Sequence, residues 1–360
     1  MKLRSARKLP GTYLFVCLKG VQLDNPLLLI FAGVVLFIIT PYLIFSDKGI
    51  FNKYRKSKKL QDKEFIENAL KFVYDCEYRG AACTINSLAG NLRITTDHCV
   101  IIVTELLRLN LIYKIDDRIV LTPEGRTYAL RIIRIHRLWE KYLADKTGIN
   151  EKEWHYQAEI QEHILSENEA DELSAILGNP LYDPHGDPIP LRDGEIPPKK
   201  GIPLTRLVDG DFAEIVHIED EPDTIYAQLT ALDLHPGMKL RIIDSNTQKI
   251  VFECEGDEKI LSPIFCANIS VVKIEHAQLQ VKEYVPLSTL EEGELAKISG
   301  ISKSIRGLQR RRLLDLGFVH GSEIIKEFSS PNGDPVAFRI KNSLIALRKE
   351  QSDKIFIERV

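Results

Sequence analysis

Hydrophobic positions divide the chain into an apolar N-terminal stretch, a helical middle part and a C-terminal part made of short strands. Residues 27–45 are apolar without interruption by a charged side chain. From residue 61 to residue 177, apolar side chains recur every three or four positions, which is the spacing of amphipathic helices. From residue 200 onwards, short apolar runs alternate with glycine-containing turns, which is typical of β-strands. The pattern predicts an α+β chain with several domains.

The N-terminal apolar run extends from Leu27 to Phe45, which is close to the ~20 residues that a helix needs to cross a bilayer core. No small-residue cleavage site follows it, which argues against a secretory signal peptide. Lysine and arginine are slightly more frequent after the run than before it, which favours a cytoplasmic C-terminal side. The prediction is a single-pass membrane anchor with the other domains in the cytoplasm. A buried helix of a wholly cytoplasmic protein is the alternative.

Helices are predicted at the start of the middle part. A first apolar stripe marks a helix in the region from Gln61 to Cys76, and the segment CTINSLAGNL gives a short helix with Thr84 as its N-cap. A further helix begins near Thr95 or Thr96. Its inward-facing side chains are expected to be Ile101, Val103, Leu106 and Leu107. Because the run from residue 100 to residue 103 is wholly apolar, at least one of its side chains should face outward.

A hairpin follows these helices. The segment LIYKIDDRIVL predicts two strands joined by an Asp-Asp turn, after which Thr122 is the N-cap and Pro123 the first residue of the next helix. A helix-turn-helix pair followed by a hairpin is a winged helix, a fold that binds DNA in some proteins and serves as a protein module in others. The residues expected to contact DNA are Arg93, Thr95, Thr96, His98, Thr104, Lys114 and Arg118.

Carboxylate and imidazole side chains gather on two consecutive helical segments between residues 131 and 190. Positions three or four apart on a helix share a face, so these side chains converge within each segment. They are His136 and Glu140 in the first segment, and His155, Glu159, Glu162 and His163 in the second. Such oxygen and nitrogen donors are ligands for divalent cations. A solvated surface is the other interpretation, because Glu is rarely buried.

Composition narrows the class of protein. The chain has 360 residues, of which 44% are hydrophobic and 28% charged, and these values are ordinary for several folded domains. The net charge is −3, so any contact with nucleic acid must come from a local patch. The six cysteines form no C-x-x-C pair, and a reducing cytosol fits them best. Since the sequence shows no P-loop, Rossmann glycine motif or nucleophile–base pair, we expect no enzyme.

The C-terminal part contains an internal duplication. One copy begins IPLTRLVDGDFAEIVHI and the other VPLSTLEEGELAKISGI, and each continues with a helix that ends in Leu-Asp-Leu. The spacing predicts two small β-barrels. A proline-rich connector leads to the first copy, and its His185 is expected to be a turn residue rather than a ligand. His217, His235 and His320 share no ligand spacing and are assigned no metal.

Three blocks together resemble the DtxR/MntR family of metal-dependent transcriptional repressors. They are HRLWEKYL, the E-x-x-E-H run that ends at His163, and NPLYDPHGDPIP. Both C-terminal repeats resemble the FeoA or SH3-like domain. The resemblance implies a winged helix-turn-helix DNA-binding domain, a helical metal-binding and dimerisation domain, and two SH3-like β-barrels. With the membrane helix and its basic linker at 1–59, the expected boundaries are 60–126, 127–190, 200–276 and 284–360.

The resemblance also implies a ligand set. The regulatory site would consist of Glu64, Glu67, His136, Glu159, Glu162 and His163, and Glu140 and His155 match a neighbouring ancillary site. Carboxylates at positions 64 and 159, where iron-sensing members place sulfur, favour Mn²⁺ with Fe²⁺ as the alternative. Metal would clamp the DNA-binding domain to the dimerisation region. In a homodimer this sets the spacing of two recognition helices on a palindromic operator in double-stranded DNA.

The segment ITPYLIFSDKGIFNKYRKSKK resembles the closing helix and basic tail of manganese/zinc ABC-transporter permeases. Two functions therefore stay open. The first is a metal-dependent regulator of metal-homeostasis genes, which the complete winged helix favours. The second is a metal-sensing regulatory module of such a transporter that does not bind DNA, which the apolar recognition helix favours.

Overall fold

The computed structural model describes residue 37, residues 50–275 and residues 285–360. The chain forms two compact units, Met1–Glu64 and Phe65–Val360. Apart from residue 37, the apolar run predicted to span the membrane lies outside the described residues, so the membrane anchor stays a prediction. In the part of the chain that the structure describes, no helix is both long and apolar enough to cross a membrane.

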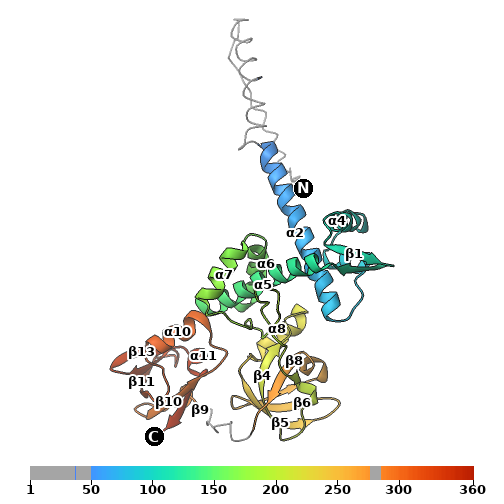
Figure 1. Cartoon of the computed structure of the whole chain (residues 1–360). Coiled ribbons are helices and arrows are strands. Elements are labelled where there is room, and N and C mark those ends of the chain that lie inside the picture. Colours follow the sequence, from blue (N-terminus) through green and yellow to red (C-terminus); the bar gives the residue numbers. More distant parts are fainter. Residues whose placement is uncertain (1–36, 38–49, 276–284) are drawn as a thin grey trace, which may run out of the picture. The chain divides into compact units, whose positions relative to one another are not determined.

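The predicted winged helix is present (Figure 1). Its elements are α2 (Ile50–Tyr78), α3 (Ile85–Asn91), α4 (Thr96–Arg108), and the antiparallel strands β1 (Ile112–Ile115) and β2 (Arg118–Leu121). Helix α2 begins earlier than the sequence pattern indicates. The side chains of Thr84 and Thr95 accept backbone N–H groups of α3 and α4, so the predicted N-cap Thr84 and the predicted start of α4 are confirmed.

The recognition helix α4 corrects one prediction. Its buried side chains are Cys99, Ile102, Val103 and Leu106. Ile101 and Leu107 were expected inside, but 66% and 40% of their surfaces are exposed. The buried set follows the i, i+3, i+4, i+7 spacing, which turns position 101 toward solvent. The expectation that at least one side chain of the apolar run faces outward is confirmed.

Helix α5 (Pro123–Lys146) organises the next part of the chain. Thr122 caps it and Pro123 is its first residue, as predicted. Its N-terminal half packs into the winged-helix core through Ala129 and Leu130, its middle into a second cluster through Leu138, and its end into a third through Leu143. The middle of α5 is therefore held by packing on both sides, between the winged-helix core and the cluster at the end of the helix.

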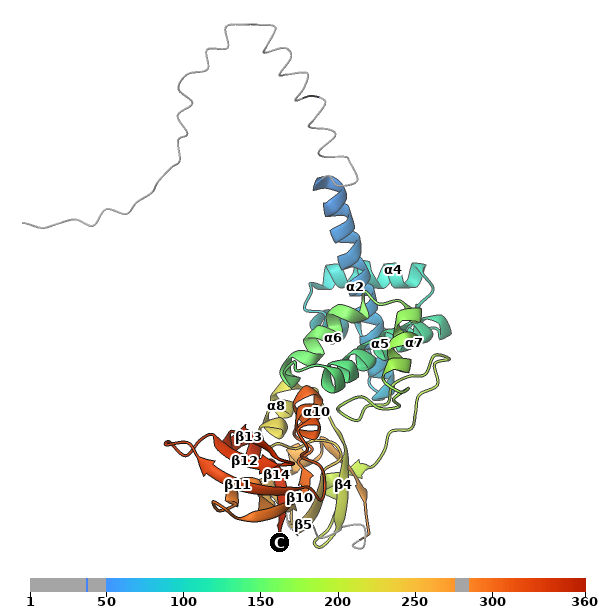
Figure 2. The same ribbon diagram turned by 90° about the vertical axis from the view of Figure 1, so that its left-hand side faces the viewer.

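The short helix η1 (Glu151–Glu153) precedes α6 (Trp154–Glu162), and α7 (Glu167–Ile176) follows. Both α6 and α7 pack against α5, as Figure 2 shows. Ser166 and Glu169 form a capping box at the start of α7, and Gly178 has a φ of +79° just after its end, which is typical of a helix stop.

The C-terminal part contains two six-stranded antiparallel sheets, which we name the first and second β-domains. The first consists of β3 (Ile202–Pro203), η2 (Leu204–Arg206), β4 (Phe212–Ile218), α8 (Asp223–Ala231), β5 (Lys239–Ser245), β6 (Ile250–Cys254), β7 (Asp257–Leu261), α9 (Pro263–Cys266) and β8 (Ile269–Lys273). The second consists of β9 (Val285–Pro286), η4 (Leu287–Thr289), β10 (Leu295–Ile301), α10 (Gly307–Asp315), β11 (Glu323–Ser329), β12 (Val336–Ile340), β13 (Ser343–Leu347), α11 (Lys349–Ser352) and β14 (Ile355–Arg359).

The two β-domains share one topology. The strand order is β3-β8-β4-β5-β6-β7 in the first and β9-β14-β10-β11-β12-β13 in the second. The register shifts also fall on equivalent strand pairs, β4/β8 with β10/β14 and β5/β6 with β11/β12. The duplication inferred from the sequence is therefore confirmed at the level of strand order.

Candidate metal centre

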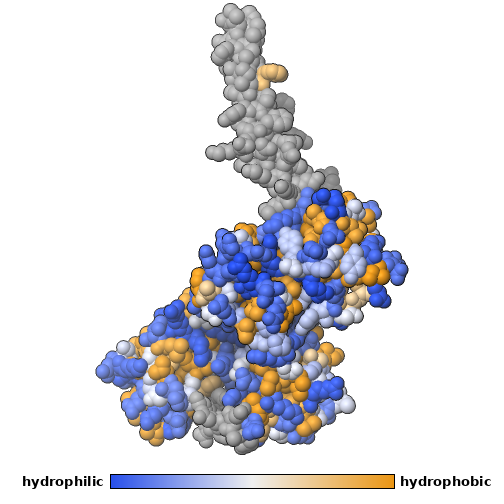
Figure 3. Space-filling model, viewed as in Figure 1, coloured by the Kyte–Doolittle hydropathy of each residue, from blue (hydrophilic) through white to orange (hydrophobic). Residues whose placement is uncertain are grey.

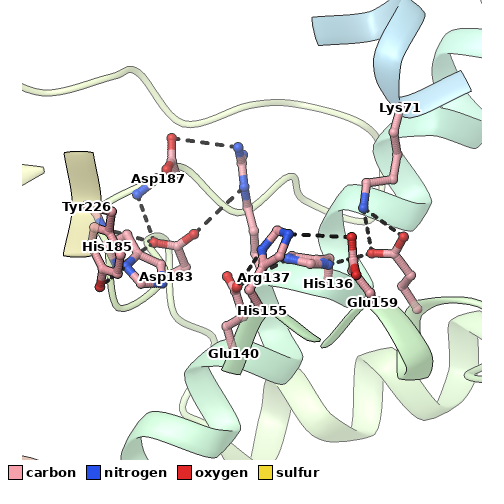
Figure 4. A network of polar contacts seen from close by, with 12 residues as sticks. Lys71, His136, Arg137, Glu140, His155, Glu159, Asp183, His185, Asp187 and Tyr226 are labelled. Atoms are coloured by element: carbon pink, nitrogen blue, oxygen red, sulfur yellow. Dashed lines mark hydrogen bonds and ion pairs between the residues drawn. The ribbon is translucent and has the colours of Figure 1, made fainter. Parts of the chain in front are cut away.

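His136 on α5 lies at the centre of a buried polar network (Figure 4). Its Nδ1 lies 2.5 Å from Oε2 of Glu162, and its Nε2 lies 3.2 Å from Oε1 of Glu140. All three side chains are buried. His136 thus joins two groups of ligand-type side chains, which we name the Glu162 cluster and the Glu140 cluster.

The Glu162 cluster brings together α2 and the end of α6. It contains Glu67, Lys71, Glu162 and His163, with Tyr128 at its edge. His163 Nδ1 lies 2.6 Å from Glu67 Oε2, and His163 Nε2 lies 3.6 Å from Glu162 Oε1. Tyr128 donates to the other oxygen of Glu67 at 2.6 Å. Lys71 donates to both oxygens of Glu162 at 2.7 Å.

Charge stabilises Glu162 despite its burial. Burial alone would raise the pKa of this carboxyl, but the Lys71 ammonium and the contact with His136 lower the pKa of Glu162 to about 2. Burial and the contact with Glu67 raise the pKa of Tyr128, so its hydroxyl stays a hydrogen-bond donor. The cluster therefore offers an ionised carboxylate at neutral pH.

The Glu140 cluster contains His136, Glu140 and His155, whose possible ligand atoms lie within 4.8 Å of one another. His155 Nδ1 lies 3.4 Å from Glu140 Oε1. Its Nε2 lies 3.5 Å from Glu159 Oε1. The structure therefore places Glu159, which is half exposed, beside His155, whereas the sequence analysis grouped it with Glu162 and His163.

A second group consists of Glu140, His185 and Asp220. The possible ligand atoms of these three residues also lie within 4.8 Å of one another. Tyr226 donates its single hydroxyl proton to the Glu151 carboxylate, and its oxygen lies 2.9 Å from His185 Nδ1. Nδ1 of His185 must then be the donor toward Tyr226. In the neutral ring this leaves Nε2 with its lone pair available for a metal.

The sequence analysis missed both of these residues. His185 lies in the predicted turn, but it is buried there and belongs to the cluster. Asp220 follows β4 in the first β-domain. The acidic run at 219–221 was visible in the sequence, but only the packing of the connector brings it to Glu140.

The connector is held in place by Asp183 and Gly186. Oδ1 of Asp183 accepts the backbone N–H groups of His185, Gly186 and Asp187 at 2.8 to 2.9 Å. Gly186 has a φ of +97°, and a Cβ there would lie 2.1 Å from the carbonyl oxygen of Val216. A larger residue would push the connector, and His185 with it, away from β4.

Opposite charges shift the pKa values of the Glu140 cluster. Burial opposes ionisation, but His136 and His155 hold the pKa of Glu140 well below its usual range. Burial also opposes a charged His155, yet Glu140 and Glu159 raise its pKa to about 11. The carboxylates are thus balanced by protonated imidazoles. A metal bound to these rings would release those protons.

The donor set fits a hard or borderline divalent cation, because it combines carboxylate oxygen with imidazole nitrogen. Within the described ranges, the groups of three or more suitable ligands are the two that share Glu140. Glu67, Glu162 and His163 lie together as expected. Glu64 is half-buried and belongs to the first compact unit, so its participation stays a prediction.

The residues predicted to contact DNA divide into two groups. Exposed side chains are those of Arg93, Thr95, Thr96, Lys114 and Arg118. The other two already have protein contacts. The ring of His98 packs edge-on against Phe65, with centroids 5.1 Å apart, and Thr104 donates to the carbonyl of Val100 at 2.7 Å. Their role in DNA binding stays a prediction.

Comparison with known families fits this geometry. The family described as iron dependent repressor, metal binding and dimerisation domain matches residues 122–191. Residues 122–191 are therefore similar to the metal-binding and dimerisation domain of iron-dependent repressors. That range includes the candidate ligands between His136 and His185, whereas Glu67 and Asp220 lie outside it. The FeoA domain family matches residues 285–359, which is the second β-domain. The FeoA identity of the first β-domain stays a prediction.

Individual relatives cover more of the chain. The chain is 28% identical over 223 residues to the iron-dependent repressor IdeR of Mycobacterium leprae, covering 58% of this chain and 96% of the relative. It is 28% identical over 192 residues to the diphtheria toxin repressor of Corynebacterium diphtheriae, covering 49% of this chain and 84% of the relative. A solved manganese-dependent transcriptional repressor in complex with manganese is 26% identical, with a TM-score of 0.52, over 58% of this chain and 100% of that one. These matches support a DtxR/IdeR-family metal-dependent repressor with a FeoA domain.

One relative has a different description. The chain is 43% identical over 72 residues to a probable metal transport system membrane protein of Chlamydia trachomatis, covering 20% of this chain and 16% of the relative. The resemblance of the N-terminal segment to permeases stays a prediction.

Proposed function

We propose that this chain is a metal-dependent, DNA-binding transcriptional regulator of metal-ion homeostasis genes, with Mn²⁺ as the first metal and Fe²⁺ as the alternative. The observation that carries the proposal is the meeting of α2, α5 and α6 at Glu162, which contacts Lys71 of α2 and His136 of α5. Glu67 comes from a helix of the winged helix, whereas His136, Glu162 and His163 come from the region that matches the dimerisation domain.

The residues themselves explain how metal would affect DNA binding. Glu67 and Glu162 are buried carboxylates that approach the same His163 from two different helices. A bound divalent cation would supply the positive charge that keeps both carboxylates together. His163 and Tyr128 orient Glu67 so that α2 stays fixed against α6. In a homodimer, a fixed α2 sets the distance between two α4 helices, which must match half-sites about one turn of DNA apart.

The alternative function is a metal-sensing module of a metal transporter that does not bind DNA. The exposed apolar side chains of Val100 and Ile101 on α4 favour it, as does the similarity to the metal transport system membrane protein. Figure 3 shows hydrophobic surface over the region where α4 and β1 lie. We prefer DNA binding because Arg93, Lys114 and Arg118 are exposed on the same winged helix and can contact phosphates.

A gel-shift experiment with the full chain and its own upstream DNA, with and without Mn²⁺, tests the proposal. We expect a shift only with metal, and we expect Glu162→Ala and His163→Ala to abolish it. Glu172→Ala, at an exposed position on α7, is the matched control and should behave like the wild type. Metal-dependent DNA binding that survives both cluster variants would contradict the assignment. Mn²⁺ binding without any DNA binding would favour the transporter module.

A further inference from the structure

The Glu162 cluster contains a cation of its own. Lys71 lies four residues after Glu67 on α2, so the two side chains share one face of the helix. Its ammonium nitrogen lies 2.7 Å from each oxygen of Glu162. The side chain of Glu162 is fully buried, whereas 24% of the Lys71 side chain is exposed. Figure 4 shows Lys71 extending from its helix, with dashed lines that mark its contacts.

We propose that Lys71 is a resident counter-ion of Glu162 that a divalent metal must displace, and that it thereby sets the metal concentration at which the Glu162 cluster fills. This inference rests on the proposed function, since it concerns the same site.

Lys71 and a metal would compete for the same oxygens of Glu162. A buried carboxylate needs a compensating charge, and Lys71 provides it through both oxygens at once. A divalent cation in this cluster needs at least one of those oxygens. Two cations at the same carboxylate would repel each other strongly in a buried environment. Metal and ammonium therefore exclude each other at Glu162.

The Lys71 side chain has access to solvent, because 24% of it is exposed. Its partly exposed, flexible side chain can turn into solvent and keep its charge hydrated there. Glu162 cannot follow, because it is fully buried and also held by His136 at 2.5 Å. The exchange of ammonium for metal can therefore proceed through a rotation of the Lys71 side chain.

The Glu140 cluster shows the contrast. Among the described contacts of Glu140, the ion-pair partners are the imidazoles of His136 and His155. An imidazole can become a metal ligand itself, whereas an ammonium has no lone pair and can only leave. Metal binding at Glu140 therefore converts the imidazole partners of this carboxylate into ligands. Metal binding at Glu162 instead has to remove the Lys71 ammonium.

The test is a calorimetric Mn²⁺ titration of the full chain as wild type, Lys71→Met and Lys71→Arg. The methionine variant keeps a similar volume without the charge, and we expect it to bind Mn²⁺ at least about tenfold more tightly, the scale of a buried charge contact. The arginine variant keeps the charge and can pair with both Glu162 oxygens, so it should bind Mn²⁺ no more tightly than the wild type. Lys141→Met is the matched control, because Lys141 pairs only with Asp145 on the surface of α5 among the described contacts.

Tighter binding separates this inference from a merely structural role, since losing a structural contact would weaken the site. Lys71→Gln, which keeps a hydrogen-bond donor but no charge, should also bind more tightly and serves if the methionine variant does not fold. Equal or weaker affinity in the uncharged variants overturns the inference and leaves the proposed function intact. No Mn²⁺ binding by wild type or variants would contradict the proposed function, and the inference with it.

Discussion

The two β-domains have the same strand order and the same bulge positions, yet they differ where each meets the helical domain. The difference lies in the connection between the second strand and the helix that follows. In the first β-domain this connection is acidic, and its Asp220 joins Glu140 and His185. In the second it contains Ser302, whose hydroxyl donates to the Glu255 carboxylate at 2.6 Å, and Lys303, whose backbone N–H donates to the same carboxylate at 3.2 Å.

The second connection also ends at α5. Gly307, the first residue of α10, lies so close to the end of α5 that an added Cβ would be 2.6 Å from the carbonyl oxygen of Thr147 and 2.7 Å from that of Ala144. The N–H of Leu308 donates to the same Thr147 carbonyl. One fold is thus used twice: one copy supplies a carboxylate to a polar cluster, and the other packs against the helix that carries His136. The chemistry depends on a few residues in the connection and not on the fold.

The largest effect is expected for Gly307→Ala. The new Cβ would collide with two backbone carbonyls, and the φ of +53° adds strain. We expect a loss of about 2–4 kcal/mol in the free energy of unfolding measured with denaturant. The matched control is Gly321→Ala, where φ is +82° but nothing lies within 4 Å of the added atom. It should cost only about 1 kcal/mol, and equal losses in both variants would refute the docking of α10 on α5.

An intermediate effect is expected for Asp220→Asn. The change keeps the shape but removes the charge that the first β-domain brings to Glu140. Calorimetric titration with Mn²⁺ should show about tenfold weaker binding at this cluster, with the Glu162 cluster unchanged. Asp257→Asn removes the same charge from an exposed position at the start of β7 and controls for net charge. If both variants bind alike, the first β-domain has no part in the metal centre.

The smallest effect concerns His235, at the boundary between the β-domains. Burial and the nearby Arg306 lower the pKa of His235 from 6.5 to about 4. The unfolded chain therefore binds more protons than the folded chain between these pH values, so stability falls as the pH drops from 6.5 to 4. In His235→Asn this contribution is absent, and the unfolding midpoint should fall less over the same range. Parallel pH curves for the two proteins would show that His235 is not held neutral by its surroundings.

Local signals allowed much of the fold to be predicted from the sequence. The caps at Thr84, Thr95 and Thr122 depend on neighbouring residues, so the starts of α3, α4 and α5 were predicted correctly. His136 and Glu140 were predicted on the same face of one helix because they are four residues apart. The duplication was visible because both copies keep the same order of turns and strands.

The errors and omissions lie where distant segments meet. Ile101 was placed inside because four consecutive apolar residues do not define which of them faces the core. His185 and Asp220 meet Glu140 only through the packing of the connector on β4. The contact between Lys71 and Glu162 joins α2 to α6, and nothing in the sequence around either residue indicates that they meet.

The most direct test of the account is the amount of Mn²⁺ that the full chain retains in equilibrium dialysis, compared between wild type and His136→Ala. His136 contacts both Glu162 and Glu140, so its loss should weaken both clusters together. The account predicts at least about one Mn²⁺ per chain for the wild type and about 100-fold weaker retention for the variant. Equal retention by the two proteins, or none by the wild type, would contradict it.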